Sequence, residues 1–235
     1  MRTAVRCTGW AGLSQTFAIL LVALPNNAAA APAEILVTAQ VRPNLFGTVA
    51  IPGPAGRWSE KWHKIAADPS QDEELSRFVA PARGLDRLAQ LSFVQAAVDR
   101  RIAWRSDGTQ YGARTYWASA SETLASGFGD DDDHAILKYQ ALAALGFPRS
   151  DYYLVMGRDR VRGDYVMLAA RANGSWWLLE EQGNSPVAAA SRAGFEPVAS
   201  FGAGRTFVHG RPRRHVPAAL LASAPGKPGT PTARR

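Results

Sequence analysis

The sequence predicts an α+β domain, in which a helical N-terminal half packs on an antiparallel β-sheet formed by the C-terminal half. Apolar residues recur at helical spacing in residues 86–102 and again in residues 132–146. From residue 152 onwards the pattern changes to short strand-like runs, and Asn173-Gly174 between two of them is a strong β-hairpin signal. Helices followed by hairpin-connected strands are the element order of this fold class.

Start and stop signals define the order of the helical half. Acidic residues 72–74 open a short helix that ends before Pro81, and Asp86 caps a longer one. The core face of this longer helix is formed by apolar residues at helical spacing, which are Leu88, Leu91, Val94, Val98 and Ile102. A further helix starts at about Asp132, and Gly146 ends it.

Short apolar runs predict the strands of the sheet. They comprise residues 152–156, 165–170, 176–179, 198–201 and 206–208. Aromatic and β-branched residues are frequent in these runs, which favours strands over helices. The sequence has no internal repeat and no Gly-rich phosphate-binding loop of either common kind.

The first 31 residues have the layout of a secretory signal peptide. Arg2 and Arg6 precede a short apolar run, residues 17–24, and alanines after it offer cleavage sites. The run is shorter than the roughly 20 residues that span a bilayer, so no transmembrane segment is expected after cleavage. We therefore expect an exported protein of the periplasm or the extracellular space. The only cysteine, Cys7, lies in this signal, so the mature protein has no thiol.

Basic charge is concentrated in a C-terminal tail. The formal net charge of +7 includes six basic residues, and no acidic one, in residues 211–235. Without this tail and the signal peptide the chain is nearly neutral, which argues against a nucleic-acid partner. The tail is rich in Pro, Ala and Gly, a composition typical of disorder, and could contact anionic surfaces. The rest of the mature chain divides into an irregular segment, residues 32–44, and a domain, residues 45–210.

An acidic run marks the most unusual part of this domain. Residues 129–135 read Gly-Asp-Asp-Asp-Asp-His-Ala. This run resembles the active-site segment of the bacterial transglutaminase-like cysteine peptidases, a family with a papain/transglutaminase-like fold, but Asp131 stands at the position of the nucleophilic cysteine. Other fragments similar to the family occur in its order, and they are Leu45-Phe46-Gly47, Lys61-Trp62, residues 98–102, Gln110-Tyr111-Gly112, Tyr116-Trp117-Ala118, residues 122–125, Lys138-Tyr139, residues 142–148 and residues 195–198.

The resemblance covers residues 45–210 and implies a Cys-His-Asp site whose three positions are held here by Asp131, Tyr165 and Glu180. Peptidase chemistry of this kind needs a thiolate and an imidazole that titrates near neutral pH, and these residues supply neither. The resemblance therefore implies a pseudo-enzyme that binds a polypeptide segment or an envelope protein. The alternative is an active hydrolase of the same fold with altered chemistry, using carboxylates such as Asp131 and Glu180.

Two interpretations of the acidic run remain open. One is helix capping combined with a solvated acidic turn. The other is a calcium site, because some members of the family bind Ca²⁺ through acidic residues beside the nucleophile, and the matching residues here are Asp130, Asp132 and Asp133. Calcium prefers several carboxylate oxygens, to which Asp131 could add one, but the spacing is not that of an EF-hand. The sequence indicates no other cofactor.

Three further residues are candidates for the wall of a cleft beside these positions. Trp117 is either a core residue or a cleft-wall residue. His134, one turn into the helix, either approaches the site or caps and packs the helix. Glu181 stands where the family usually has asparagine. The sequence identifies neither the ligand, nor the partner, nor the oligomeric state.

Overall fold

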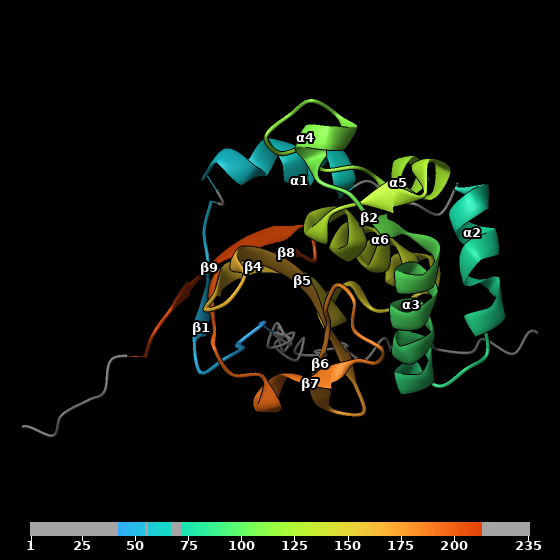
Figure 1. Cartoon of the computed structure of the whole chain (residues 1–235). Helices are drawn as coiled ribbons and strands as arrows, with labels where there is room; N and C mark the ends of the chain where they lie inside the picture. The colour runs from blue at the N-terminus through green and yellow to red at the C-terminus, as the bar shows by residue number, and fades with distance from the viewer. Residues whose placement is uncertain (1–41, 55, 67–71, 213–235) are drawn as a thin grey trace, which may run out of the picture. The chain divides into compact units, whose positions relative to one another are not determined.

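The computed structural model describes residues 42–54, 56–66 and 72–212 (Figure 1). They belong to the second of two compact units, Ala39–Arg235, whereas the first unit, Met1–Thr38, lies outside the described residues. The expected signal peptide, most of the irregular segment and nearly all of the basic tail also lie outside them. Within the described residues, no helix is long and apolar enough to cross a membrane.

The elements follow the predicted order of helices first and strands second. The α-helices are α1 (Ser59–Ile65), α2 (Glu73–Val79), α3 (Arg87–Arg101), α4 (Asp107–Gln110), α5 (Ala120–Ser126) and α6 (Asp131–Ala144). The strands are β1 (Val49–Pro52), β2 (Ala103–Trp104), β3 (Phe128–Gly129), β4 (Tyr152–Asp159), β5 (Gly163–Ala172), β6 (Ser175–Leu179), β7 (Val187–Ala188), β8 (Phe195–Gly202) and β9 (Arg205–Gly210). The α+β class predicted from the sequence is confirmed.

Two of the helices begin at the caps that the sequence indicates. The Asp86 side chain accepts hydrogen bonds from the N–H groups of Leu88 and Ala89, each at 3.0 Å, at the start of α3. The Asp72 side chain accepts one from the N–H of Leu75 at the start of α2. Each cap satisfies backbone donors that the helix itself leaves free, which stabilises the helix by about 1 kcal/mol.

The main sheet has seven strands in the order β1-β9-β8-β4-β5-β6-β7, and all neighbours are antiparallel. Asn173 and Gly174 have φ angles of 52° and 77° in the turn between β5 and β6, so the predicted hairpin is confirmed. A separate parallel pair joins β2 to β3 and sets Trp104 opposite Gly129. This pair brings a residue that follows α3 beside the start of α6.

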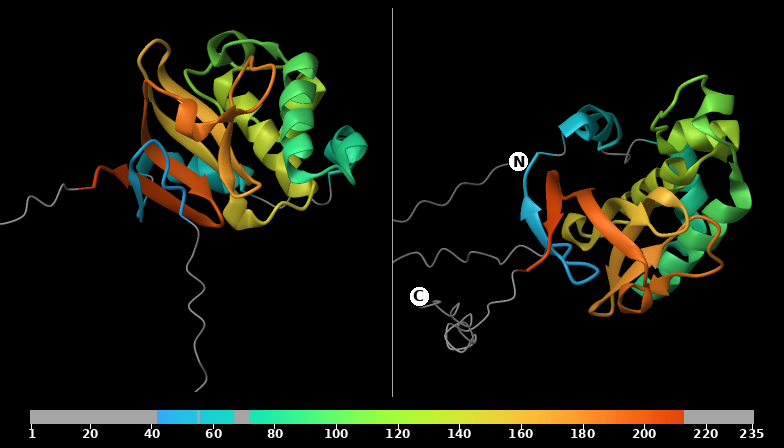
Figure 2. Two further views of the ribbon diagram at one scale, coloured as in Figure 1. Left: turned by 90° about the horizontal axis from the view of Figure 1, so that it is seen from below. Right: turned by 60° about the vertical axis from the view of Figure 1, so that its left-hand side comes forward.

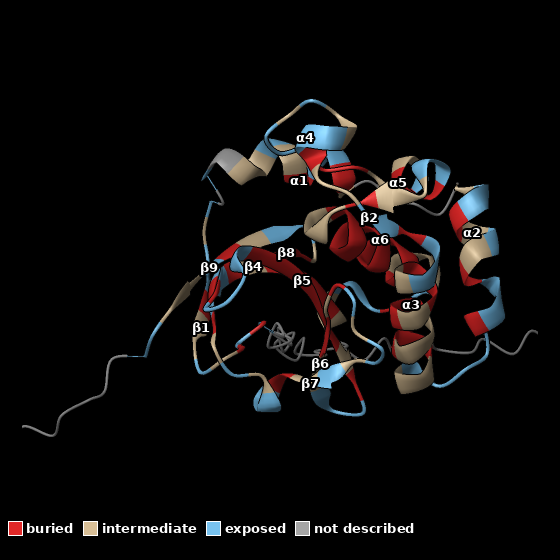
Figure 3. Cartoon of the chain, viewed as in Figure 1, coloured by how far each residue is buried: buried red, intermediate tan, exposed pale blue. Residues whose placement is uncertain are grey.

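Helix α6 lies between the main sheet and the other helices (Figures 1 and 2). It contacts β4 and β5 on one side and α2, α3 and α5 on the other. Every residue from Asp133 to Leu142 is buried (Figure 3). A second core cluster lies on the opposite face of the sheet and packs Tyr153 and Phe207 near Leu45. Because α6 is enclosed on all sides, its N-terminus has a fixed place relative to the sheet.

His209 in β9 bridges two hydroxyl groups and makes stability depend on pH. Its Nδ1 lies 2.7 Å from Thr48 Oγ1, and its Nε2 lies 2.7 Å from Ser200 Oγ. Burial lowers the pKa of His209 from 6.5 to about 4. The unfolded chain therefore takes up a proton at a higher pH than the folded chain, and stability decreases as the pH falls through this window.

We predict that the free energy of unfolding falls by about 2–3 kcal/mol between pH 7 and pH 4 because of His209. Urea unfolding at a series of pH values measures this change, and the His209→Gln variant should show a smaller pH dependence. His63→Gln, at an exposed position, provides the matched histidine-to-glutamine control. Equal pH dependence in the wild type and in His209→Gln would contradict the prediction.

Candidate functional site

The N-terminus of α6 carries a cluster of carboxylates. Asp130 is the N-cap, and its side chain accepts a hydrogen bond from the N–H of Asp132 at 3.2 Å. Gly129, just before the cap, lies against Asp133, since a Cβ at position 129 would be 2.6 Å from the Asp133 Cβ. A residue with a side chain cannot fit there without displacing Asp133 or the helix start. The helix dipole and the free N–H groups of the first turn favour the negative charges.

Asp131 is the first residue of α6 and lies beside an exposed tryptophan. The indole Nε1 of Trp104 donates to Asp131 Oδ1 at 3.3 Å, and 53% of Trp104 is exposed. Burial raises the pKa of Asp131, the indole hydrogen bond opposes this shift, and the charge of Asp130 adds to it. The sequence did not single out Trp104 because its place beside Asp131 depends on the pairing of β2 with β3.

Tyr165 lies in the same region, at the start of β5. It is buried, and its hydroxyl oxygen accepts a hydrogen bond from the N–H of Glu181 at 2.9 Å. The Arg162 guanidinium carbon lies 4.6 Å from the centre of its ring. Burial raises the pKa of Tyr165, and the negative charges of Glu180 and Asp131 contribute to the shift. The structure thus brings Asp131 and Glu180 within electrostatic range of Tyr165.

Arginine side chains engage the carboxylate of Glu180. Arg192 Nε donates to Glu180 Oε1 at 2.7 Å, and Arg192 Nη2 donates to Glu180 Oε2 at 3.3 Å. The same Nη2 lies 2.6 Å from Asp159 Oδ2. Arg162 Nη1 is farther from Glu180, at 4.0 Å. The carboxylate of Glu180 is therefore held by Arg192 instead of contacting the hydroxyl of Tyr165.

His134 and Glu181 are buried behind these residues. His134 is 2% exposed and Glu181 is 8% exposed. His134 Nδ1 lies 3.5 Å from Asp99 Oδ1, whereas His134 Nε2 and Glu181 Oε1 have no hydrogen-bond partner among the described residues. Burial raises the pKa of Glu181, and the charge of Asp131 adds to the rise. Of the two interpretations of His134, the structure therefore favours a packed residue of the helix.

A buried ammonium group fixes the segment that follows β6. Lys138 in α6 has no exposed side-chain surface, and its Nζ lies 2.8 Å from Asp99 Oδ1 and donates to the carbonyl oxygen of Glu180 at 2.8 Å. Gln95 Nε2 is 2.7 Å from the same carbonyl oxygen and from that of Gly183. Although burial opposes it, contacts with His134 and Lys138 lower the pKa of Asp99. The only sequence signal for this network is a lysine inside the apolar stretch of α6.

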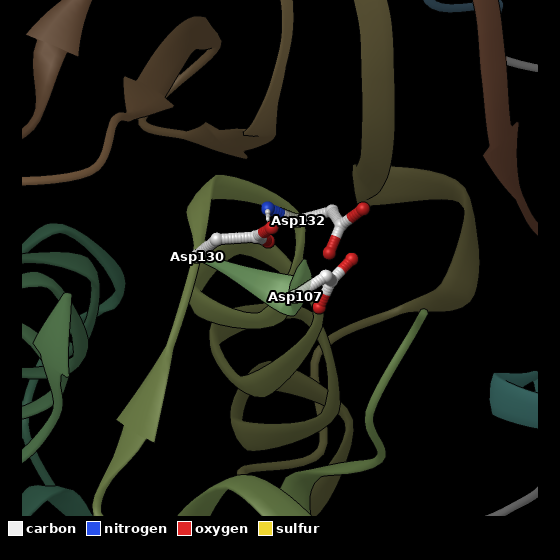
Figure 4. Close-up of side chains that lie close together, drawn as sticks. All are labelled: Asp107, Asp130 and Asp132. Atoms are coloured by element: carbon white, nitrogen blue, oxygen red, sulfur yellow. Dashed lines mark hydrogen bonds between the residues drawn. The ribbon is translucent and has the colours of Figure 1, made fainter. Parts of the chain in front are cut away.

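The structure brings a different set of three carboxylates together than the sequence suggested. Oxygen atoms of Asp107, Asp130 and Asp132 lie within 4.8 Å of one another (Figure 4). Asp133, expected in this group, instead accepts a hydrogen bond from the N–H of Ala118 at 2.8 Å. Asp107 belongs to α4, so its approach depends on the fold and not on the spacing within the acidic run.

This group of three fits a hard cation. Asp107 Oδ1 and Asp132 Oδ1 are buried without a hydrogen-bond partner among the described residues. Burial raises the pKa of Asp132 well above its usual range, and the charges of Asp130, Asp133 and Asp107 add to the rise. Burial also raises the pKa of Asp107. Unpaired carboxylate oxygens that repel one another are the environment that Ca²⁺ stabilises.

Trp117 is part of the hydrophobic core. It is 2% exposed, its ring packs edge-on against Phe201 at 5.8 Å and stacks on Trp58 at 5.7 Å. The sequence left two interpretations of Trp117 open, and its burial supports the interpretation as a core residue.

Comparisons with known proteins agree with this architecture. The sequence model of the bacterial transglutaminase-like cysteine proteinases (BTLCP) matches residues 67–196. Calcium-bound Legionella pneumophila LapG is 21% identical, with 69% of this chain and 97% of that chain covered and a TM-score of 0.52. EGTA-treated Legionella pneumophila LapG is also 21% identical, with 63% and 84% covered and a TM-score of 0.51. At this identity the likeness establishes a shared fold. A comparison with curated proteins gives no match.

The Lys138–Asp99 pair makes a stability prediction. Asp99→Ala leaves a buried ammonium group without its counter-charge and should reduce the free energy of unfolding by about 3–5 kcal/mol. Urea unfolding at pH 7 measures the loss. The double variant Asp99→Ala/Lys138→Met removes both charges and should be clearly more stable than Asp99→Ala alone. If the double variant is no more stable, the loss does not arise from the unpaired charge.

Proposed function

The chain belongs to the bacterial transglutaminase-like cysteine proteinase family, and from this premise we propose that it is an exported member without cysteine-peptidase activity, which retains its cleft as a polypeptide-binding surface. Arg2, Arg6 and the apolar run 17–24 support export through a cleaved signal peptide. A polypeptide segment or an envelope protein is the proposed partner, and the basic tail is proposed to contact anionic surfaces.

The residue at the start of α6 carries this proposal. Asp131 stands where the family segment has its nucleophilic cysteine, and the only cysteine of the chain, Cys7, lies in the proposed signal peptide. Thiol chemistry depends on a sulfur atom that can become a thiolate. A carboxylate at the same place accepts hydrogen bonds, as Asp131 does from Trp104, but it does not replace the thiolate in peptide cleavage.

The environment of the other two positions supports the same conclusion. Burial raises the pKa of Tyr165 above its usual value, so its hydroxyl group stays protonated at neutral pH and is no general base. Glu180 would be the orienting acid, but both of its oxygens bind Arg192. We therefore propose that Asp131, Tyr165 and Glu180 form a polar site that cannot carry out the proton transfer required for cleavage by a cysteine peptidase.

Exposed apolar side chains near this site support a binding role. Trp104, beside Asp131, is 53% exposed, and Val161 in the turn between β4 and β5 is 93% exposed. Soluble proteins bury most large apolar side chains, and exposed ones that border a polar site are frequent in protein interfaces. We therefore propose that a polypeptide segment lies between the β4–β5 turn and β2.

We also propose that calcium binds to Asp107, Asp130 and Asp132. Their oxygen atoms lie within 4.8 Å of one another, and LapG has a calcium-bound form in a similar fold. Bound calcium would offset the mutual repulsion of these carboxylates and would tie α4 to the N-terminus of α6. Its proposed role here is structural, since it would fix the floor of the cleft.

The rival candidate is an active hydrolase that uses carboxylates. It is favoured by the pKa of Asp131, which burial raises, and by the pKa of Glu181, which burial raises in the same region. A carboxyl group with a raised pKa can serve as a general acid. Glu180 is the weaker member of the pair Asp131–Glu180 because Arg192 binds its carboxylate. Loss of any hydrolysis on Asp131→Asn would support this rival.

We predict that the purified protein does not hydrolyse a fluorogenic peptide library and is not labelled by thiol-reactive peptide probes. The variant Asp131→Cys/Tyr165→His/Glu180→Asp should become labelled and should cleave peptides about 100-fold faster than Asp131→Cys alone, because a general base contributes this much or more. Adding Arg192→Ala should increase the rate further by freeing the carboxylate at position 180. Robust peptide hydrolysis by the unmodified protein would contradict the proposal.

Calcium should stabilise the protein. At a calcium concentration of about 100 times the Kd, the stabilisation is about 2.7 kcal/mol, which corresponds to a rise in Tm of about 5–10 °C for a domain of this size. Differential scanning calorimetry measures the rise, and EGTA should reverse it. Asp107→Asn should abolish most of it, whereas Asp164→Asn, an exposed carboxylate elsewhere, should leave it intact. No rise in Tm at millimolar calcium would rule out the site.

A further inference from the structure

Arg162 is the cationic side chain that lies over the proposed site. It is the last residue of the turn between β4 and β5, where its backbone N–H donates to Asp159 Oδ1 at 3.0 Å. Its guanidinium carbon lies 4.6 Å from the centre of the Tyr165 ring. Its charge also acts on Asp131 and Glu181. Backbone anchoring and stacking on the ring hold the guanidinium group beside Tyr165 before any ligand arrives.

The hydrogen-bond donors of Arg162 are free. Within the described residues its guanidinium group makes no hydrogen bond, and its nearest carboxylate oxygen, Glu180 Oε2, is 4.0 Å away. Its side chain is 42% exposed, so a ligand can reach it from solvent. A guanidinium group carries five N–H donors in a planar fork that matches a carboxylate. The guanidinium group of Arg162, which is held in place and has free N–H donors, can therefore bind a carboxylate of a ligand.

Glu180 does not occupy the N–H donors of Arg162. Its two oxygens accept hydrogen bonds from Arg192 at 2.7 and 3.3 Å, both shorter than the distance to Arg162. Arg192 is anchored in turn by Asp159 at 2.6 Å. Because Arg192 already pairs with both Glu180 and Asp159, the guanidinium N–H groups of Arg162 remain available for an acceptor from outside the chain.

A second arginine extends the positive edge. Arg160, two residues earlier in the same turn, is exposed and has no side-chain hydrogen bond or ion pair among the described residues. Its aliphatic part lies against Gly194, where a Cβ would be 3.7 Å from Arg160 Cδ. Val161, between the two arginines, is 93% exposed. An extended polypeptide could therefore contact an apolar side chain and two guanidinium groups at one turn.

We propose that the cleft binds an acidic polypeptide segment and that Arg162 forms a bidentate pair with an Asp or Glu side chain of this segment, with Arg160 as a second contact. This inference rests on the proposed polypeptide-binding function and adds the class of ligand. Of the carboxylates nearby, Asp131 accepts the Trp104 indole N–H, Glu180 is paired with Arg192, and the Asp107 group is the proposed calcium site. Side chains of an extended segment alternate in direction, so its acidic side chains can point toward Arg162 and Arg160 while its backbone passes Asp131.

Binding of three matched peptides to the purified protein tests this inference. The probes are fluorescein-labelled twelve-residue peptides of Gly, Ser and Val that differ only in carrying Glu, Gln or Lys at alternate positions. Fluorescence anisotropy in calcium-containing buffer gives each Kd. The Glu peptide should bind about ten-fold more tightly than the Gln peptide, and Arg162→Gln should remove this preference, because paired charges at an interface contribute at least this much. Arg162→Lys should keep only part of it, since an ammonium group lacks the planar fork.

Arg158→Gln is the matched control. Arg158 lies beside the same turn, is 79% exposed and pairs with Asp164 at 3.5 Å. The Arg158→Gln substitution therefore removes one positive charge but leaves the guanidinium group of Arg162 beside Tyr165. It should change the Kd of the Glu peptide less than two-fold, as expected for a screened surface charge. Circular dichroism establishes that each variant is folded.

The other outcomes separate this inference from the function on which it rests. Equal binding of the Glu and Gln peptides, or tighter binding of the Lys peptide, would overturn the acidic ligand while leaving polypeptide binding intact. Equal loss of binding in Arg158→Gln and Arg162→Gln would reduce the effect to general surface charge and overturn the role of Arg162. Binding to phosphatidylglycerol vesicles but to no peptide would overturn both the inference and the proposed function.

Discussion

The ammonium group of Lys138 has no contact with solvent, so everything that keeps it charged must come from inside the protein. Asp99 on α3 supplies the counter-charge, and the carbonyl oxygen of Glu180 supplies a further acceptor. A buried charge without partners would cost several kcal/mol, which makes these contacts obligatory. One side chain of α6 thereby fixes both α3 and the segment after β6. Glu181 lies in that segment, and its N–H in turn holds the hydroxyl group of Tyr165.

The polar groups around the start of α6 form two separate networks. On one side, the carboxylates of Asp107, Asp130 and Asp132 lie together, and among the described residues Asp107 Oδ1 and Asp132 Oδ1 have no donor, an arrangement suited to a cation. On the other side, carboxylates are already paired with arginine, as Arg192 binds both Asp159 and Glu180. The charges of Asp130 and of Arg162 both act on Asp131. The hydrogen bonds and ion pairs of the two networks hold the residues around Asp131 in place, and they do not depend on any reaction at the site.

The sequence predicted those features that depend on local patterns. The caps Asp72 and Asp86 and the hairpin at Asn173-Gly174 are short-range signals, and the structure has all of them. The sequence pattern missed β1 and β7, which lie at the two edges of the sheet, and α1 and α5, which are only seven residues long each. Short elements of this kind carry little periodicity, and tertiary contacts decide whether they form.

Only those residues of the site that are contiguous in the sequence could be predicted. The acidic run and the order of family fragments located Asp131 and its neighbours, but Asp107 reaches them from α4 through the fold. In the same way, no spacing rule connects Trp104 with Asp131 or Arg192 with Glu180, since each pair joins residues on different elements. The burial of Trp117 could not be decided from the sequence either, because an aromatic residue in a loop packs inward or outward according to its neighbours.

The parallel pairing of β2 with β3 has a spectroscopic consequence. It sets Trp104 opposite Gly129, two residues before Asp131, so the indole ring moves with the start of α6. Trp62 and Trp117 are buried, whereas Trp104 is half exposed and hydrogen-bonded to a carboxylate. An apolar group that covers Trp104 transfers its indole from water to an apolar contact. The emission of this tryptophan then shifts to shorter wavelength, which gives the protein an intrinsic optical reporter beside Asp131.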